Sequence, residues 1–250
     1  MLKERLLSLK HLCPGRLLPI GLAPRRSVLG AALLILCALQ FVVGERIAAS
    51  AWVDPPYSYA RNYISDLGVT ACDVKCSPLH PVMNASFVLL GVLFFVATVL
   101  LTSFVPTGAR TLQILLAVLF AIGLIAAAAI HSQPQSGRLV IFHAIGALVA
   151  LFVSNYSLVR IGGFARRLHV RPGLAAACIV LGSAGIVCTS LFAIQSPMLP
   201  RPVFERAATY AFLLGCVITG ISILCSEANR EAKRDTTQGV MPPRLKKSKT

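Results

Sequence analysis

Residues 76–109 have the sequence CSPLHPVMNASFVLLGVLFFVATVLLTSFVPTGA, a run of 34 residues with no aspartate, glutamate, lysine or arginine. A helix needs roughly 18 to 20 such residues to cross a hydrocarbon core about 30 Å thick, because backbone polar groups in lipid must bond within their own segment. Five more uncharged runs of at least 18 residues lie at 27–44, 111–137, 139–159, 172–200 and 207–226. The sequence therefore predicts an all-α integral membrane protein, a bundle of six transmembrane helices.

The chain divides into one membrane domain and two tails. The expected helices are 27–49, 84–104, 111–130, 139–159, 173–195 and 205–225. They form a membrane domain over residues 27–226, which includes a long loop at 50–83. A basic tail, 1–26, precedes this domain, and a basic segment at 227–250, polar and expected to be disordered, follows it.

The overall composition agrees with this class of protein. Apolar residues make up 56% of the chain and charged residues 13%, and the net charge is +15. Soluble domains have about 45–50% apolar residues and about a quarter charged. A nucleic-acid-binding protein of similar charge would spread its lysines and arginines along exposed elements. We therefore expect membrane lipids, and no nucleic acid, as partners.

The basic residues also predict an orientation. Of the 24 lysines and arginines, 18 lie on the side of the two tails and 6 on the opposite side. The positive-inside rule then places both termini in the cytoplasm and the loop 50–83 on the outer face. The alternative is a signal peptide cleaved near Ala49-Ser50-Ala51, although its apolar run exceeds the usual 7 to 15 residues.

Two cysteines share the outer loop. Cys72 and Cys76 lie four residues apart in the sequence CDVKC, in an oxidising compartment under this orientation. The sequence predicts a disulfide between them. The alternative is that the two cysteines bind zinc. Such a site needs further thiols or histidines, and only His80 is close by.

The outer loop carries a dense polar stretch that resembles a known family. RNYISDLG at 61–68 is followed by SPLHPVMNASFVLLG at 77–91, FHAIGAL at 142–148 and FERAATY at 204–210. These segments resemble the bacterial and archaeal membrane proteins grouped as domain of unknown function 998, over about residues 28–226. The resemblance implies a six-helix fold and a multi-pass protein of the bacterial cytoplasmic (plasma) membrane. No activity comes with it.

The chain departs from the family at one point. The third helix in that family usually ends in an apolar residue, Phe, Pro and an acid, and the matching sequence here is Ile130-His131-Ser132-Gln133-Pro134. A fainter similarity of the ISDLG core points to six-helix eukaryotic proteins of the Frag1, DRAM and Sfk1 type, which are tied to lipid handling.

Three residues are candidates for catalysis. Ser65 and Asp66 are adjacent in the loop, and His143 lies one turn into the fourth helix; Ser, His and an acid are the parts of a nucleophilic hydrolase. The alternative is a turn or helix cap, in which the Asp66 carboxylate bonds backbone amides and Gly68 takes a positive φ. For His143, the alternative is a hydrogen bond to a neighbouring helix.

A metal site is a weaker candidate. His80, His131, His143, Asp66 and Glu205 all belong to the outer face, and imidazole with carboxylate suits zinc or iron. None of these pairs has the i, i+4 spacing of a helical metal motif, so no cofactor is predicted.

A polar network on the outer face is the favoured site. Glu205 would pair with Arg61, or Arg206 with Asp66, and tie the loop over the bundle. The candidate ligand-binding residues are Arg61, Asn62, Tyr63, Asn84, Glu205 and Arg206. The small residues at 126–129, 182–185 and 215–220 are assigned to close helix packing.

Three functions remain open at this stage. The first is an accessory module that binds a lipid or lipid-linked headgroup at the outer leaflet. The second is a membrane-embedded hydrolase or transferase that uses Ser65 and His143 or a metal. The third is a transporter of a small molecule, or one coupled to protons.

Overall fold

The computed structural model describes residues 24–70, 77–129, 137–167 and 172–239. Six long helices dominate it: α2 Pro24–Ser50, α3 His80–Leu100, α4 Arg110–Ala129, α5 Gly137–Arg167, α6 Pro172–Ala193 and α7 Arg201–Gly239. Three short 3-10 turns accompany them, η2 Ser65–Gly68, η3 Thr102–Phe104 and η4 Thr107–Ala109. Each long helix contains a segment long and apolar enough to cross a membrane. The prediction of an all-α, six-helix membrane protein is confirmed.

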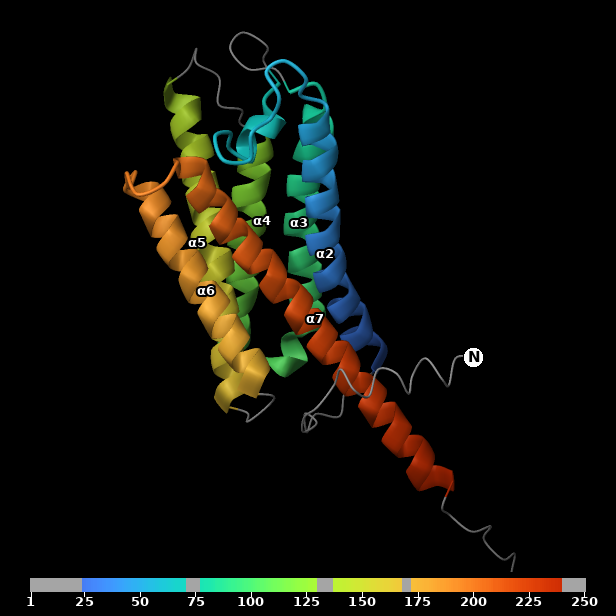
Figure 1. Ribbon diagram of the computed structural model, residues 1–250. Coiled ribbons are helices and arrows are strands. Elements are labelled where there is room, and N and C mark those ends of the chain that lie inside the picture. The colour runs from blue at the N-terminus through green and yellow to red at the C-terminus, as the bar shows by residue number, and fades with distance from the viewer. Residues whose placement is uncertain (1–23, 71–76, 130–136, 168–171, 240–250) are drawn as a thin grey trace, which may run out of the picture.

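The helices form a closed ring. Each packs against the next one along the chain, and α7 packs against α2 to complete the circle. Figure 1 shows the segment between α2 and α3 folded over one end of the bundle, with the first residues of α2 at the other end. We call these the loop end and the basal end. Side chains such as Ile122, Val180 and Val187 point outward and are more than half exposed, as expected for a lipid-facing surface.

Several helix boundaries differ from those expected. Helix α3 begins at His80, four residues early, because Pro81 suits the first turn of a helix. Helix α5 continues to Arg167 and α7 to Gly239, past the ends expected at 159 and 225. The uncharged runs mark only the part of a helix that lies in lipid. A helix rich in Ala, Glu, Lys and Arg continues into water at little cost, so α7 enters the segment expected to be a disordered tail.

Small residues bring the helices together. A Cβ atom on Gly182 of α6 would lie 2.7 Å from the backbone oxygen of Asn155 on α5, and one on Gly220 of α7 would lie 2.7 Å from that of Ala31 on α2. Helix backbones in contact at this distance leave no room for a side chain. The assignment to close packing is confirmed for Gly182 and Gly220.

Candidate functional site

Arg206 is the centre of the polar network at the loop end. It lies in the second turn of α7 and is 7% exposed. Its Nε donates to the carboxylate of Glu45 near the end of α2, at 3.3 Å. Its Nη1 donates to the backbone oxygens of Tyr59 and of Asn62, the latter at 2.9 Å, and its Nη2 donates to the Tyr57 hydroxyl. One buried guanidinium thus joins two helices to three residues of the loop.

Aromatic rings surround this guanidinium. Its carbon lies 5.4 Å from the ring centroid of Tyr57 and 4.9 Å from that of Tyr59. Trp52 packs edge-on against Tyr57 at 5.3 Å between centroids. Burial raises the pKa of Tyr57, so the hydroxyl stays neutral and donates to the backbone oxygen of Tyr63 at 2.8 Å. The rings exclude water and strengthen the electrostatic contacts of Arg206.

Glu205, near the start of α7, bonds the ISDLG turn at residues 64–68. Its carboxylate accepts hydrogen bonds from the backbone N–H of Ile64, at 2.8 Å, and from that of Ser65. The Asp66 carboxylate accepts from the backbone N–H of Tyr63 at 2.9 Å. The ISDLG segment therefore has the geometry of a hydrogen-bonded turn.

Gly68 serves this turn in another way than expected. Its φ angle is not in the left-handed region, and a Cβ atom at this position would lie 2.3 Å from Oδ1 of Asn84. The Asn84 side chain donates to the backbone oxygen of Gly68 at 3.0 Å. The expectation of a positive φ was wrong: the absence of a side chain at Gly68 leaves room for the Asn84 side chain of α3.

The pairings within the expected network differ from those found. Arg206 bonds Glu45, while Glu205 bonds backbone amides. Arg61 lies exposed on the loop. The Asn62 side chain accepts from the backbone N–H of Ser58 at 3.0 Å, and the Tyr63 ring packs on Phe192 at 6.1 Å between centroids. Most of the expected ligand-binding residues hold the protein itself together.

Asp66 and His143 each bond a backbone group of another residue. Nδ1 of His143 lies 3.1 Å from the backbone oxygen of Ala127 on α4, so the imidazole donates to a neighbouring helix. Asp66 bonds Tyr63, and Ser65 lines a cavity beside Glu205. These contacts match the structural alternatives for Asp66 and His143.

The metal candidates find no support in the described ranges, and the disulfide candidates lie outside them. His80 is half-buried at the start of α3. Across 24–70, 77–129, 137–167 and 172–239, no three or more histidine, cysteine, aspartate or glutamate side chains are grouped to hold a metal ion. His131, Cys72 and Cys76 lie outside the described residues.

Sequence reasoning missed four members of the network: Glu45, Tyr57, Tyr59 and Tyr210. Glu45 is 1% exposed and also accepts from the Tyr210 hydroxyl at 2.7 Å. A signal was present, because Glu45 directly follows the uncharged run of the first helix. A carboxylate at the edge of the membrane needs a partner and is a candidate for function.

A cavity of about 40 Å³ lies under the loop, within the bundle. Ser65, Glu205, Ser154 and Thr209 supply the polar part of its wall. The remaining wall is apolar, with Phe41, Ile64, Phe87, Leu90, Phe120, Leu124, Ala127, Ala147, Ala150, Leu151 and Phe212. We call it the loop-side cavity.

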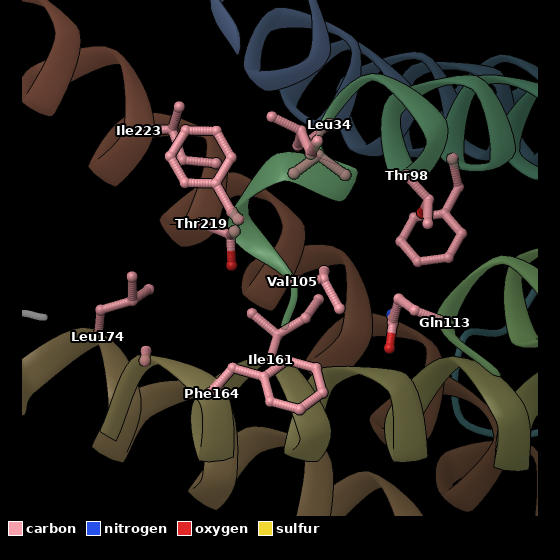
Figure 2. A pocket seen from close by; sticks show the side chains of 13 residues that line it. Leu34, Thr98, Val105, Gln113, Ile161, Phe164, Leu174, Thr219 and Ile223 are labelled. Atoms are coloured by element: carbon pink, nitrogen blue, oxygen red, sulfur yellow. The ribbon is translucent and has the colours of Figure 1, made fainter. Parts of the chain in front are cut away.

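A larger cavity of about 100 Å³ lies in the other half of the bundle, and we call it the basal cavity. All six long helices contribute to its wall, which consists of Leu34, Phe94, Thr98, Leu101, Phe104, Val105, Gln113, Ile161, Phe164, Ala165, Leu174, Thr219 and Ile223. Figure 2 shows apolar side chains of Leu34, Ile161 and Ile223 around a shared space. Its residues at the basal end, such as Phe104 and Phe164, are half-buried, whereas Phe94 is 2% exposed. The wall of the cavity is therefore more exposed at the basal end, and we take this end as its opening.

Two arginines contact the cavity wall at this end. Nε of Arg160 donates to Gln113 in the cavity wall at 3.3 Å, and its guanidinium carbon lies 5.2 Å from the ring centroid of Phe164. Arg110 donates to the backbone oxygen of Val105, a further wall residue, at 3.0 Å. Arg166 and Arg167 are exposed in the last turn of α5. An apolar cavity with a cationic mouth suits a ligand that has an apolar chain and an anionic head.

Comparison with known proteins gives a family but no characterised relative. A family model described as "Protein of unknown function (DUF998)" matches residues 35–222. No curated protein and no solved structure matches the chain.

Proposed function

The chain belongs to the DUF998 family of proteins of unknown function, and within that family we propose that it binds a single-chain anionic amphiphile in the basal cavity. The ligand is of the fatty-acid or alkyl-phosphate type. Its hydrocarbon chain enters between the helices, and its head stays among the arginines at the opening. This is a binding function, with no reaction assigned.

The basal cavity is the observation that carries the proposal. Ten of its thirteen wall residues are apolar, and Thr98, Gln113 and Thr219 are the polar exceptions. Its volume of about 100 Å³ approaches the roughly 150 Å³ of a dry apolar cavity that admits benzene. Several methylene groups therefore fit, and the apolar wall solvates them about as well as bilayer chains do.

Charge supports an anionic head. Arg25, Arg26, Arg110, Arg160, Arg166 and Arg167 all belong to the basal end. Arg160 already contacts the cavity wall through Gln113 and Phe164. A guanidinium at the mouth of an apolar cavity binds carboxylate or phosphate in a fixed orientation.

This proposal moves the lipid site away from the loop end. Arg206, Asn84 and Glu205 were expected to contact a headgroup, but their side chains bond the protein itself. A ligand there would have to displace these bonds, and Nε, Nη1 and Nη2 of Arg206 are all engaged. Arg160 also bonds the protein, to Gln113 through Nε and to the backbone oxygen of Ala109 through Nη2, but it does so at the cavity wall. The hydrolase hypothesis gains no support either, because His143 is bonded to α4.

The location of the protein follows from the charge distribution. We propose that it resides in the cytoplasmic membrane of a bacterium with both termini and the basal cavity on the cytoplasmic side. The ligand then comes from the inner leaflet or the cytoplasm. The loop end faces the outside, where an oxidising environment favours the disulfide between Cys72 and Cys76.

A variant that fills the cavity mouth tests the proposal. Ala165→Phe places a ring at the opening, and Val187→Phe adds the same ring on the lipid-facing side of α6, where Val187 is 56% exposed. Binding of dodecyl phosphate is measured by calorimetry in phosphatidylcholine nanodiscs, with protein-free nanodiscs as the reference. We expect Ala165→Phe to weaken binding at least about fivefold, since overpacking costs about 1–3 kcal/mol. Val187→Phe should bind like the natural protein.

A second variant, Arg160→Gln, tests whether the anionic head of the ligand contributes to binding. It removes the positive charge and keeps a hydrogen-bonding side chain. It should weaken binding of dodecyl phosphate and leave binding of the uncharged dodecyl maltoside unchanged. Equal binding of dodecyl phosphate by Ala165→Phe and the natural protein would place the ligand outside the basal cavity. Absence of any binding above protein-free nanodiscs would refute the proposed function.

A further inference from the structure

Three phenylalanines separate the two cavities along the axis of the bundle. Phe94 of α3 lines the basal cavity, and Phe120 of α4 and Phe212 of α7 line the loop-side cavity. The rings contact one another edge-on, with centroid distances of 5.3 Å for Phe94 and Phe120 and 5.0 Å for each of the other two pairs. Each ring is 2% or 3% exposed. We call them the phenylalanine triad.

We infer that the phenylalanine triad limits the length of the hydrocarbon chain that the basal cavity accepts. The inference rests on the proposed function, because it concerns the ligand of the same cavity. The tip of a chain that enters from the basal end meets Phe94 first, and the other two rings stand behind it. A chain that reaches farther has to bend or displace a ring.

The rings are suited to this role because they are close-packed. Edge-to-face pairs are stabilised beyond their burial, and each ring of the triad has two such partners. Helices α3, α4 and α7 each supply one ring, so displacing a ring disturbs the contact between helices. Interiors packed at this density respond to an added methylene with strain.

The space beyond the triad would accept more chain if the rings were smaller. The loop-side cavity is lined on its apolar side by residues such as Phe41, Leu90 and Leu124. Two of its four polar groups, Ser65 and Glu205, come from the ISDLG turn and the start of α7. Removing a ring therefore joins two largely apolar spaces, and the polar turn becomes the new limit.

The expected binding profile follows from competition with lipid. Bilayer chains solvate a methylene about as well as an apolar cavity does, so affinity relative to the bilayer should stay level while the chain fits. It should fall at least about tenfold once the tip meets the triad, because overpacking is destabilising. The chain length at which affinity falls is the break length.

The experiment compares break lengths. Alkyl phosphates from hexyl to hexadecyl, lengthened two carbons at a time, are titrated into nanodiscs that hold the natural protein, Phe120→Ala or Phe87→Ala. Phe120→Ala should raise the break length by at least two carbons and leave shorter ligands unaffected. Phe87 also lines the loop-side cavity, but it pairs with Phe41 at 5.5 Å and lies outside the triad. Its variant should keep the natural break length.

Folding is checked by the thermal unfolding midpoint of each variant. If Phe120→Ala does not fold, Phe120→Leu removes less volume and should give a smaller increase. Equal break lengths in the natural protein and the triad variants, or an equal increase in Phe87→Ala, would refute the triad's role and leave the proposed function standing. Absence of binding at every chain length would overturn both.

Discussion

Arg206 illustrates how a charged residue is accommodated at the edge of a membrane. Its guanidinium is 7% exposed and is compensated by one carboxylate, two backbone oxygens, one hydroxyl and two aromatic rings. A guanidinium presents five donors in a fixed plane, so it bonds partners on several sides at once. Arg206 therefore stabilises the position of the loop, and its donors are occupied by the protein rather than available to a ligand.

Arg206→Lys tests this structural role. Lysine keeps the charge but not the planar fork, so some buried acceptors lose their donor, at a cost of about 1–3 kcal/mol in the free energy of unfolding. The midpoint of thermal unfolding is followed by the fluorescence of Trp52, the single tryptophan, which packs against Tyr57. We expect a lower midpoint than in the natural protein.

Arg61→Lys is the matched control, because Arg61 is exposed on the same loop. It should leave the midpoint unchanged, since exposed charges contribute about 0–1 kcal/mol. A midpoint for Arg206→Lys equal to that of the control would mean that the buried network does not hold the loop in place.

At the scale of elements, the contact between α5 and α6 depends on glycine. Gly182 on α6 faces Asn155 and Val159 on α5, and a Cβ atom there would lie 2.7 Å from the backbone oxygen of Asn155 and 2.9 Å from the backbone nitrogen of Val159. A backbone cannot move aside as a flexible side chain can. The two helices would have to separate to admit even one methyl group.

We therefore expect Gly182→Ala to lower the free energy of unfolding by roughly 1–3 kcal/mol, as overpacking does. Gly173→Ala, on the same helix, has nothing within 4 Å of the added carbon and should be neutral or slightly stabilising. Midpoints of thermal unfolding of the two purified variants give the comparison. Equal midpoints would show that α5 and α6 are not in close contact at Gly182.

At the scale of the whole molecule, the distribution of basic residues predicts which end faces the cytoplasm. Ala60 and Gly108 are both exposed, Ala60 at the loop end and Gly108 at the basal end between α3 and α4. In a background whose eight cysteines are replaced by alanine, Ala60→Cys and Gly108→Cys each offer one thiol.

A membrane-impermeant maleimide should label Ala60→Cys in intact cells and Gly108→Cys only after lysis. The reason is that 18 of 24 basic residues belong to the basal side, which the positive-inside rule retains in the cytoplasm. Labelling in the reverse order would invert the topology and place the basal cavity on the outer side of the membrane.

The sequence by itself determined the number and class of the helices. A bilayer of fixed thickness requires uncharged runs of a minimum length, and that requirement is local along the chain, so six runs predicted six helices. The resemblance of RNYISDLG, SPLHPVMNASFVLLG and the later motifs also predicted the family that matches residues 35–222. The polar loop residues were correctly identified as a network that ties the loop to α7, but most of their partners were not.

Only the tertiary structure decided those partners and the cavities. Arg206 bonds Glu45, which lies 161 residues away along the chain, and no local pattern connects the two. The basal cavity and the phenylalanine triad likewise require α3, α4 and α7 to meet at one depth of the bundle. Hydropathy identifies residues that avoid water. All six helices are apolar, so hydropathy does not distinguish which helices are partners. Which side chains contact each other depends on how each helix is rotated and how deep it lies in the bundle. Close packing of the six helices determines this rotation and this depth.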